Sequence, residues 1–378
     1  MRRHIRFAAA ALAGLSAAAA SVALVPSATA TSGPYTPEAV PRGCEVSGAF
    51  EVCTLDPTQS GGQDNAIEER LTQYTAEAGD GDSIRVAMYS WTRREVADAL
   101  VAASDRGADV KIVIDDIIKQ SNTEAYKVLS ASDIPLTSCV DSCLGTGINH
   151  NKFFLFDVGG AVSAAQTSSN MTSTQQTKYN NMLTVTGDTG LYDWYTGYWN
   201  RLNAKSWTYD GVTWGDADKI YRGDGVEAYA YPRGSDNLLG ILNNITECGD
   251  DHGTIRVAQS MFREKRVAIR DRLAELQDSL GCDVQVITSS EGTDEQWVEA
   301  GGLDPAKVVS LESHNKLIIV DAFMSDRSQQ AVFTGSHNLT GTSLSNNDEA
   351  IVKVENDAFV FGAFTAYFDG MYDRAGGA

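Results

Sequence analysis

Two short segments of this chain carry the same set of reactive side chains. The pattern H-x-K-x4-D occurs at residues 150–157 and again at residues 314–321, so its two histidines lie 164 residues apart. A histidine ring can attack phosphorus or carry a proton, and ammonium groups stabilise the negative charge that grows in a phosphoryl transition state. The pattern therefore indicates chemistry on a phosphodiester. Its members are His150, Lys152 and Asp157 in the first copy and His314, Lys316 and Asp321 in the second.

A polar cluster that ends in asparagine follows each copy. The clusters are Thr167-Ser168-Ser169-Asn170 and Gly335-Ser336-His337-Asn338. Amide donors beside two lysines could bind the oxygens of a phosphate, and we expect Ser168 and Ser336 to support them. Gly335 stands where the first cluster has Thr167, so we expect the backbone to differ there, because glycine tolerates conformations that threonine does not.

The segments between the motif residues are typical of buried strands. Residues 153–156 and 317–320 are continuous apolar runs. Side chains two apart in a strand share a face, so each histidine and its lysine should point into the same cavity. Asp157 and Asp321 lie at an odd offset from their histidines. We therefore assign both aspartates to structural support.

The flanking sequence indicates an internal repeat that spans most of the chain. Residues 84–114 and 255–287 both predict strand, helix, strand, with a glycine that closes the helix. Aromatic-rich segments at about residues 191–202 and 359–373 predict helices, whose aromatic side chains we expect to pack onto a sheet. The predicted fold class is α/β, with two similar halves that each contain a mixed sheet flanked by helices.

The duplicated motif resembles that of the phospholipase D superfamily, in which it is called HKD. The resemblance implies that the two halves, residues 31–220 and 221–378, pack as a pseudo-dimer with the active site at their interface. His150 matches the nucleophile that forms a phosphohistidine, and His314 matches the general acid, although spacing does not decide which histidine plays which part. The matching phosphate-binding set is Lys152, Lys316, Asn170 and Asn338.

One further carboxylate fits this resemblance. Glu349 lies 11 residues after Asn338, where the family commonly places an acid that orients a catalytic histidine. Asn181 is the first-half equivalent, and an amide cannot stabilise imidazolium as an anion would. We therefore expect the two histidines to have unlike pKa values, while the histidine that Glu349 serves stays open. The tyrosyl-DNA phosphodiesterase branch also has an amide in its first half, so a nuclease remains an alternative.

The N-terminus and the cysteines predict an exported protein. Three arginines precede an Ala-rich apolar run that ends in the cleavage signal Ala28-Thr29-Ala30, so residues 1–30 read as a signal peptide and the mature protein as secreted. Six cysteines then suit disulfides, for which the simplest of 15 pairings joins sequence neighbours. Those pairs are Cys44 with Cys53, Cys139 with Cys143, and Cys248 with Cys282.

Charge bears on the substrate. Removing residues 1–30 takes away three arginines and no acidic residue, which changes the formal charge from −20 to −23. Such a surface disfavours nucleic acid and anionic membranes. We therefore expect a phospholipid with a zwitterionic head group, transient contact with a membrane surface, a monomeric protein, and neither metal nor other cofactor. The alternatives are a secreted HKD-type nuclease and a catalytically inactive lipid-binding homologue.

Several other residues carry weaker expectations. Tyr89 and Trp91 follow a predicted strand and could line the rim of the site. His337 could touch substrate or lie in a surface turn, and His252 should be solvated. Asn170 and Asn338 both begin glycosylation sequons, but burial in the site makes glycans improbable there.

Overall fold

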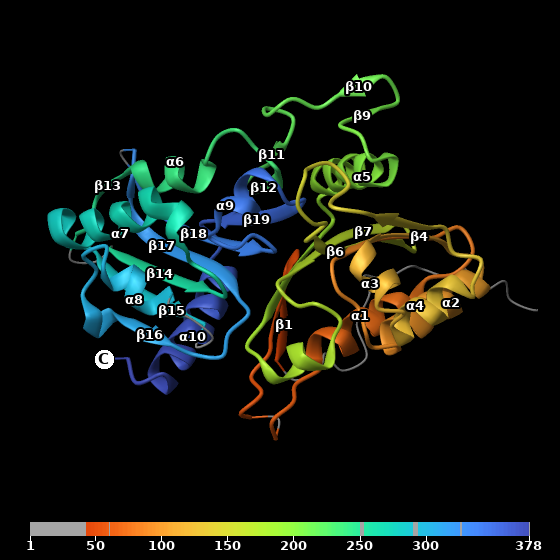
Figure 1. Ribbon diagram of the computed structural model, residues 1–378, viewed down its shortest axis with the longest axis horizontal. Helices are drawn as coiled ribbons and strands as arrows, with labels where there is room; N and C mark the ends of the chain where they lie inside the picture. Colours follow the sequence, from red (N-terminus) through yellow and green to blue (C-terminus); the bar gives the residue numbers. More distant parts are fainter. Residues whose placement is uncertain (1–42, 60, 250–252, 290–293, 326, 378) are drawn as a thin grey trace, which may run out of the picture. The chain divides into compact units, whose positions relative to one another are not determined.

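The computed structural model describes residues 43–377 except 60, 250–252, 290–293 and 326. These residues form two α/β halves, each built on one mixed sheet flanked by helices (Figure 1), which confirms the predicted fold class. The predicted signal peptide at residues 1–30 and His252 lie outside the described residues. Among the helices that the structure describes, none is both long enough and apolar enough to cross a membrane.

The first sheet has the strand order β1-β2-β8-β7-β6-β3-β4-β5. Strands β3, β4 and β5 run parallel, and the remaining neighbours pair antiparallel. The strands are β1 (Cys44–Ser47), β2 (Phe50–Thr54), β3 (Ser83–Met88), β4 (Asp109–Asp115), β5 (Leu136–Cys139), β6 (Lys152–Val158), β7 (Ala161–Thr167) and β8 (Asn181–Thr186). The helices of this half before β8 are α1 (Ala66–Glu77), α2 (Glu95–Asp105), α3 (Asp116–Gln120) and α4 (Glu124–Ser130).

The second sheet repeats this arrangement in the order β11-β12-β19-β18-β17-β14-β15-β16, and β13 (Ile245–Glu247) adds to β17. The strands are β11 (Ile220–Arg222), β12 (Val226–Tyr231), β14 (Thr254–Gln259), β15 (Asp283–Thr288), β16 (Val308–Ser310), β17 (Lys316–Met324), β18 (Arg327–Gly335) and β19 (Glu349–Glu355). Its helices include α6 (Asn237–Asn243), α7 (Val267–Leu280), α8 (Asp294–Glu299) and α9 (Gly341–Ser345). A small hairpin, β9 (Thr208–Tyr209) and β10 (Val212–Thr213), joins the halves, and short 3-10 turns span Ser173–Thr177, Glu264–Arg266 and Pro305–Lys307.

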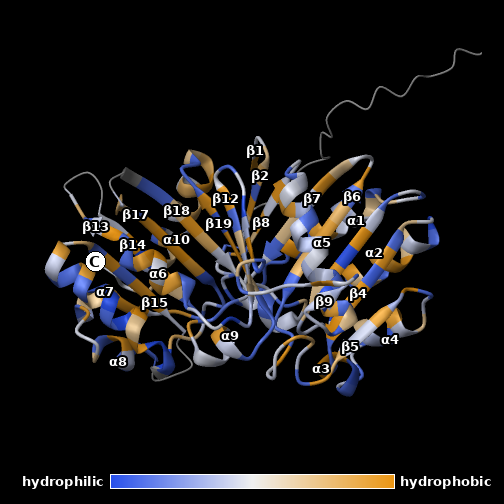
Figure 2. Cartoon of the chain, turned by 90° about the horizontal axis from the view of Figure 1, so that it is seen from above, coloured by the Kyte–Doolittle hydropathy of each residue, from blue (hydrophilic) through white to orange (hydrophobic). Residues whose placement is uncertain are grey.

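Three hydrophobic cores hold these layers together. Two cores lie between a sheet and its own outer helices, and the third includes one face of both sheets together with α5 (Thr189–Ala204) and α10 (Ala358–Arg374). Figure 2 shows hydrophobic residues along central strands such as β14, β15 and β17. The aromatic helices pack as predicted, because Tyr195, Trp199, Phe364 and Phe368 are buried in this third core. The third core therefore joins the two halves.

Strand register brings the two motifs to corresponding ends of the sheets. Lys152 begins β6 and pairs with Met88, the last residue of β3, while Lys316 begins β17 and pairs with Gln259, the last residue of β14. Both lysines thus lie at the carboxyl ends of β3 and β14, where α/β sheets place ligands. The predicted strand-helix-strand repeat is confirmed, and Gly281 closes α7 in the left-handed conformation with φ of 68°.

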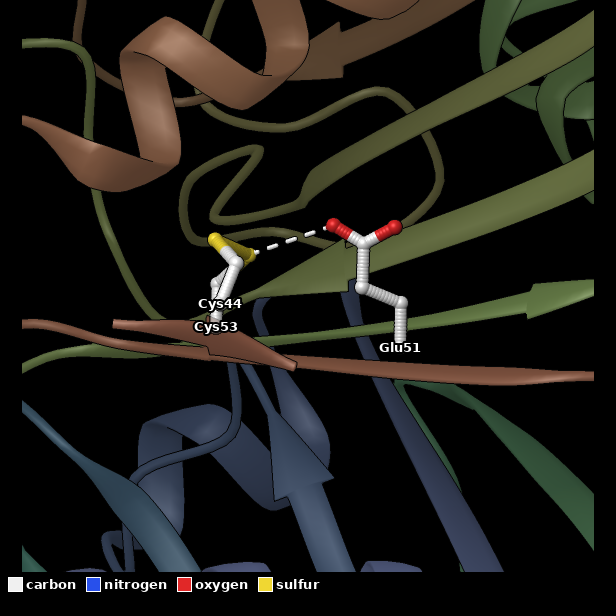
Figure 3. A group of neighbouring side chains, drawn as sticks. All are labelled: Cys44, Glu51 and Cys53. Carbon is white, nitrogen blue, oxygen red and sulfur yellow. Dashed lines mark hydrogen bonds between the residues drawn. A yellow bond between two sulfur atoms is a disulfide. The ribbon is translucent and has the colours of Figure 1, made fainter. Parts of the chain in front are cut away.

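All six cysteines form disulfides, in the three pairs of sequence neighbours that were expected. Cys44 and Cys53 lie beside Glu51, whose Oε1 is 3.4 Å from Cys53 Sγ (Figure 3). This group does not suit a metal ion, because the two sulfurs are bonded to each other and the carboxylate is paired with Arg70 and Tyr74.

The disulfides should differ in their contribution to stability. Cys248–Cys282 closes a loop of 34 residues, whereas Cys139–Cys143 closes one of 4. The entropy of the unfolded chain predicts that the free energy of unfolding falls by about 4 kcal/mol in C248S/C282S and by about 2 kcal/mol in C139S/C143S. Denaturant unfolding of the two double variants measures these values. Equal losses would show that loop entropy does not govern them.

Candidate active site

The two halves hold each other's motif histidine through the backbone. The His150 amide donates to the Asp348 carbonyl (2.9 Å), and the Asp348 amide donates back to the Ile148 carbonyl (3.0 Å). On the other side the His314 amide donates to the Tyr179 carbonyl (2.9 Å). These are isolated parallel bridges between strand ends of opposite halves. They place both motif histidines at the junction of the halves.

His150 is held by a carboxylate from the second half. Its Nδ1 donates to Glu349 Oε2 at 2.9 Å, and both side chains are buried. Ser336 Oγ donates to the same carboxylate oxygen at 2.5 Å. Since Nδ1 carries the proton, Nε2 keeps its lone pair. Glu349 therefore serves the histidine of the other half, which settles the question that the sequence left open.

The electrostatics of this pair favour a neutral ring beside a carboxylate anion. Burial lowers the pKa of His150 to about 4, although Glu349 opposes the shift. Burial by itself would raise the pKa of Glu349, but His150, His337 and Lys152 outweigh it and lower that pKa to about 2. A neutral imidazole with a free Nε2 is the form that can act as a nucleophile.

His314 has no carboxylate in this position. Its Nδ1 lies 3.0 Å from the Ser168 carbonyl oxygen and 3.3 Å from Asn180 Oδ1. Both are acceptors, so Nδ1 carries a proton and Nε2 is the atom free to exchange one. Burial lowers the pKa of His314 well below its usual value, and Lys316, Lys152 and His150 add to the effect. The predicted difference between the surroundings of the two histidines is present in the structure.

The amide that contacts His314 is one residue away from the expected one. Asn181 does not contact the ring. Its Nδ2 donates to Asn315 Oδ1 at 2.5 Å, and its Oδ1 accepts from Thr334 Oγ1. Asn180 occupies the orienting position because it precedes β8, where the chain has not yet entered the regular alternation of the strand. Asn181 is instead a buried link between the halves.

The two motif lysines are buried beside their histidines. Lys152 Nζ and Lys316 Nζ each donate at 2.7 Å to the carbonyl of the histidine two residues earlier, and Lys316 Nζ also lies 3.1–3.2 Å from the His314 ring nitrogens. Burial lowers the pKa of Lys152 to about 7 and that of Lys316 well below its usual value. Two lysines, with the carboxylates of Glu349 and Asp115 near Lys152, form a site that can bind an anion.

The structure buries both asparagines of the polar clusters. Asn170 and Asn338 each have a buried Oδ1 that no described group satisfies. The two clusters differ in their backbones, because a Cβ at Gly335 would lie 2.2 Å from the Ala350 carbonyl oxygen, whereas Thr167 fits and donates to the Asn181 carbonyl. Ser168 Oγ donates to Asn180 Oδ1 at 3.1 Å.

The motif aspartates lie away from the histidines, at the far ends of the antiparallel pairings. Asp157 pairs with Ser83 at the start of β3, and Asp321 pairs with Thr254 at the start of β14. Asp321 also accepts from Gln330 Nε2 at 3.0 Å. This placement is consistent with structural support.

The middle residue of each motif also makes a contact that the sequence analysis did not predict. The middle residues, Asn151 and Asn315, donate to the hydroxyls of Tyr198 (3.1 Å) and Tyr367 (3.2 Å) on α5 and α10. Tyr198 then donates to the Glu349 carbonyl and Tyr367 to the Asn180 carbonyl. The sequence did contain a sign of this role. The H-x-K pattern allows any residue at its middle position, yet both copies have asparagine there.

Three other expectations have definite outcomes. Tyr89 does lie at the site, with its ring centroid 4.9 Å from that of His150. Trp91 is not a rim residue, since it is fully buried and meets Phe154 edge-on. His337 is not in a surface turn either, because it is 2% exposed and stacks on Tyr231 with centroids 4.2 Å apart. Ser336 donates to Glu349, whereas the His337 ring lies between Tyr231 and Arg266, whose Nη1 is 3.0 Å from His337 Nε2.

Asp348 connects the site to the loop of the Cys139–Cys143 disulfide. Its carboxylate accepts from the amides of Cys143 (2.6 Å), Leu144 (3.1 Å) and Gly145 (3.1 Å). Gly145 packs so closely that a Cβ would lie 1.9 Å from the Asn346 carbonyl oxygen. The first-half loop is therefore fastened to the residue whose carbonyl holds His150.

The family follows from these features and from comparison with known proteins. The family model described as "Cardiolipin synthase, PLD-like domain" matches residues 72–203 and 241–372, one span in each half. These spans cover more than half of the chain, so the chain belongs to this phospholipase D-like family. Members of the wider superfamily act on phosphodiester bonds. A search of curated proteins found no match.

Two solved structures with TM-scores above 0.5 share this fold at low sequence identity. Phosphatidylserine synthase from Haemophilus influenzae Rd KW20 has a TM-score of 0.57 at 11% identity, with 86% of each chain covered. Polyphosphate kinase from Porphyromonas gingivalis has a TM-score of 0.58 at 13% identity, with 85% of this chain covered. This chain spans about half, 46%, of that kinase. Nuc from Salmonella typhimurium is 26% identical over 40% of this chain, which covers 91% of Nuc, with a TM-score of 0.32.

Replacing Glu349 by glutamine should separate charge from geometry at His150. Glutamine can still accept from Nδ1 but does not stabilise a charged ring, so we expect turnover to fall by about 10²–10⁴-fold. Steady-state kinetics on any accepted phosphodiester measures this, with the exposed Glu124→Gln as control. Near-normal turnover of E349Q would contradict the role given to the carboxylate.

A carboxylate at position 180 should favour the protonated, cationic form of His314. In Asn180→Asp the new anion favours imidazolium and raises the pKa of His314. A general acid must be protonated, so activity should persist to higher pH, with the alkaline limb of the pH–rate profile shifted by about one unit. Asn203→Asp, at an exposed position where the side chain only accepts from Thr137 Oγ1, is the control for an added charge. An unshifted limb in N180D would show that His314 does not set it.

Proposed function

We propose that this chain is a secreted phosphodiesterase of the phospholipase D type, which cleaves the bond between phosphate and head-group alcohol in a phospholipid. The observation that carries the proposal is the unlike hydrogen bonding of the two motif histidines. His150 has a carboxylate at Nδ1 and a free Nε2, while the acceptors at His314 Nδ1 are both neutral and Lys316 Nζ lies close to the same ring. This division supports one nucleophile and one proton carrier.

In the first step His150 Nε2 attacks phosphorus, and the bond from phosphorus to the head-group oxygen breaks. For this step His314 must be protonated at both nitrogens, a form that the bound phosphate anion favours. The leaving oxygen takes the Nε2 proton, and the ring is left neutral with its proton on Nδ1. The new P–N bond leaves the His150 ring cationic, and Glu349 stabilises this cation through Nδ1. Lys152 and Lys316 stabilise the charge on the phosphoryl oxygens, with amide donors of Asn170 and Asn338 as further partners.

The second step returns the enzyme to its starting state. Neutral His314 Nε2 accepts a proton from water, whose oxygen attacks phosphorus. The P–N bond then breaks, and its electron pair returns to His150 Nε2. The products are a phosphatidic-acid-type monoester and the free alcohol. A primary alcohol in place of water would give an exchanged phosphodiester.

Charge supports a lipid over a nucleic acid. The formal charge of −23 that remains without residues 1–30 disfavours a polyanion. It also disfavours anionic membranes, which leaves zwitterionic lipids as the preferred class. The similarity to a phosphatidylserine synthase structure is consistent with lipid chemistry but concerns the fold. Export and removal of residues 1–30 remain part of the proposal, and the three disulfides suit an oxidising compartment.

A side-by-side assay of the purified mature protein in the presence of EDTA tests the proposal. The substrates are phosphatidylcholine, phosphatidylethanolamine and sphingomyelin vesicles and single- and double-stranded DNA. We expect release of head group, intact DNA and, when ethanol is added, a phosphatidylethanol-type adduct. Degraded DNA with untouched lipid would move the chain to the nuclease alternative, and activity lost only with EDTA would contradict a metal-independent mechanism.

His150→Ala and His314→Ala are the matched inactive variants, and turnover of each should fall by several orders of magnitude. Wild-type protein that binds vesicles without releasing product would support the inactive lipid-binding alternative. Hydrolysis without adduct at every alcohol concentration would contradict a phosphohistidine that water and alcohol can reach.

A further inference from the structure

Helices α5 and α10 occupy equivalent places in the repeat but present different outer faces. Each begins after a capping aspartate, Asp188 or Asp357, whose side chain accepts from the amide three residues later. Counting from these caps, Tyr198 corresponds to Tyr367, and each hydroxyl binds the middle asparagine of a motif. The two helices can therefore be compared residue by residue.

On α5 the outer face carries Trp194, Gly197 and Tyr198. Two tryptophans from the segment that contains β9 and β10 cover this face. Trp207 and Trp214 lie over Tyr198 with centroid distances of 6.1 and 6.5 Å, and Trp214 also stacks on Trp194 at 5.7 Å. A Cβ at Gly197 would lie 3.1 Å from the Trp214 ring. Two indole rings thus fill the space beside the helix.

On α10 no tryptophan of the described residues covers the equivalent face, and only the Tyr179 ring lies near Tyr367, with centroids 6.4 Å apart. The residues that correspond to Trp194, Gly197 and Arg201 are Ala363, Ala366 and Gly370. Together with β1 and β2 they border a groove of about 420 Å³, which we call the α10 groove. Its lining residues are Gly43, Glu45, Val52, Thr54, Asp56, Gln59, Tyr179, Gly362, Ala363, Ala366, Tyr367, Gly370, Met371 and Arg374.

One polar group in this groove is poorly satisfied. Tyr179 is 4% exposed, and its buried hydroxyl lies beside Thr58 and Asp56 without making a hydrogen bond of normal geometry to either of them or to another described group. Its polar neighbours are already engaged, since Thr58 Oγ1 donates to Asp56 Oδ1 at 2.6 Å and Arg374 Nη2 donates to Asp56 Oδ2 at 3.1 Å. An unsatisfied buried hydroxyl is costly, and a ligand group could pair with it.

From the filled groove on α5 and the open one on α10, we infer that the α10 groove binds a free bicyclic aromatic molecule through Tyr367 and the Tyr179 hydroxyl. The ring would lie against Tyr367 as the indoles lie against Tyr198, over the small side chains of Ala363 and Ala366. A ring N–H would donate to Tyr179 Oη. The groove volume is within the range of small-molecule sites, and the inference does not depend on the proposed activity.

Indole is the probe for this inference. Ligand-observed saturation-transfer NMR on the mature protein should show saturable binding with a Kd of about 1 mM, as expected for a ligand of this size. 1-Methylindole, which lacks the N–H, should bind about fivefold more weakly, because it cannot donate to the hydroxyl. Equal affinity for the two probes would overturn the part assigned to Tyr179, and absence of saturable indole binding would overturn the site.

Two pairs of variants locate the site. Ala366→Trp places an indole in the groove and should weaken binding of free indole at least tenfold, whereas Ala76→Trp on the exposed face of α1 should leave it unchanged. Tyr179→Phe should remove the preference for indole over 1-methylindole, and the exposed Tyr209→Phe should retain it. Retention of wild-type binding by A366W, with folding verified by circular dichroism, would exclude the α10 groove.

Discussion

The exchange of hydrogen bonds between the two halves is the constraint on which the site depends. Each motif histidine is attached to its own sheet by the lysine that begins the next strand and to the other half by its backbone amide. Neither half contains a complete set of contacts for its own histidine, because Glu349 reaches His150 and the Ser168 carbonyl reaches His314. Active-site geometry is therefore a property of the interface.

The same exchange allows the two copies to differ in chemistry while sharing a fold. A carboxylate at one Nδ1 stabilises positive charge on His150, whereas carbonyl groups at the other fix the tautomer of His314 and leave its pKa low. The difference comes from the Glu349 side chain on one side and from the Ser168 carbonyl and the Asn180 amide on the other. Duplication supplies two similar histidines, and their neighbours distinguish them.

Sequence reasoning succeeded where the determining contacts are local or periodic. Apolar runs after His150 and His314 predicted the strands, and the repeat predicted the two mixed sheets. It failed by one residue at Asn180, because the position of an amide at the end of a strand depends on where regular alternation begins. The predictions that Trp91 lies at the rim and that His337 could lie in a surface turn were wrong for a related reason. Both side chains are buried by partners distant in the sequence, Phe154 for Trp91 and Tyr231 for His337.

The buried lysines explain how an acidic protein can bind an anion. Lys152 and Lys316 lie close to the two motif histidines, with Glu349 and Asp115 as the nearby carboxylates, and burial lowers the pKa of both ammonium groups. A phosphate that enters would offset their desolvation and favour their protonated forms. Local complementarity is thus independent of the formal charge of −20, which acts on long-range encounter and not on the bound state. In the proposed function, the negative charge would disfavour the approach of polyanionic substrates, and the groups at the interface between the halves would act on a phosphodiester that binds.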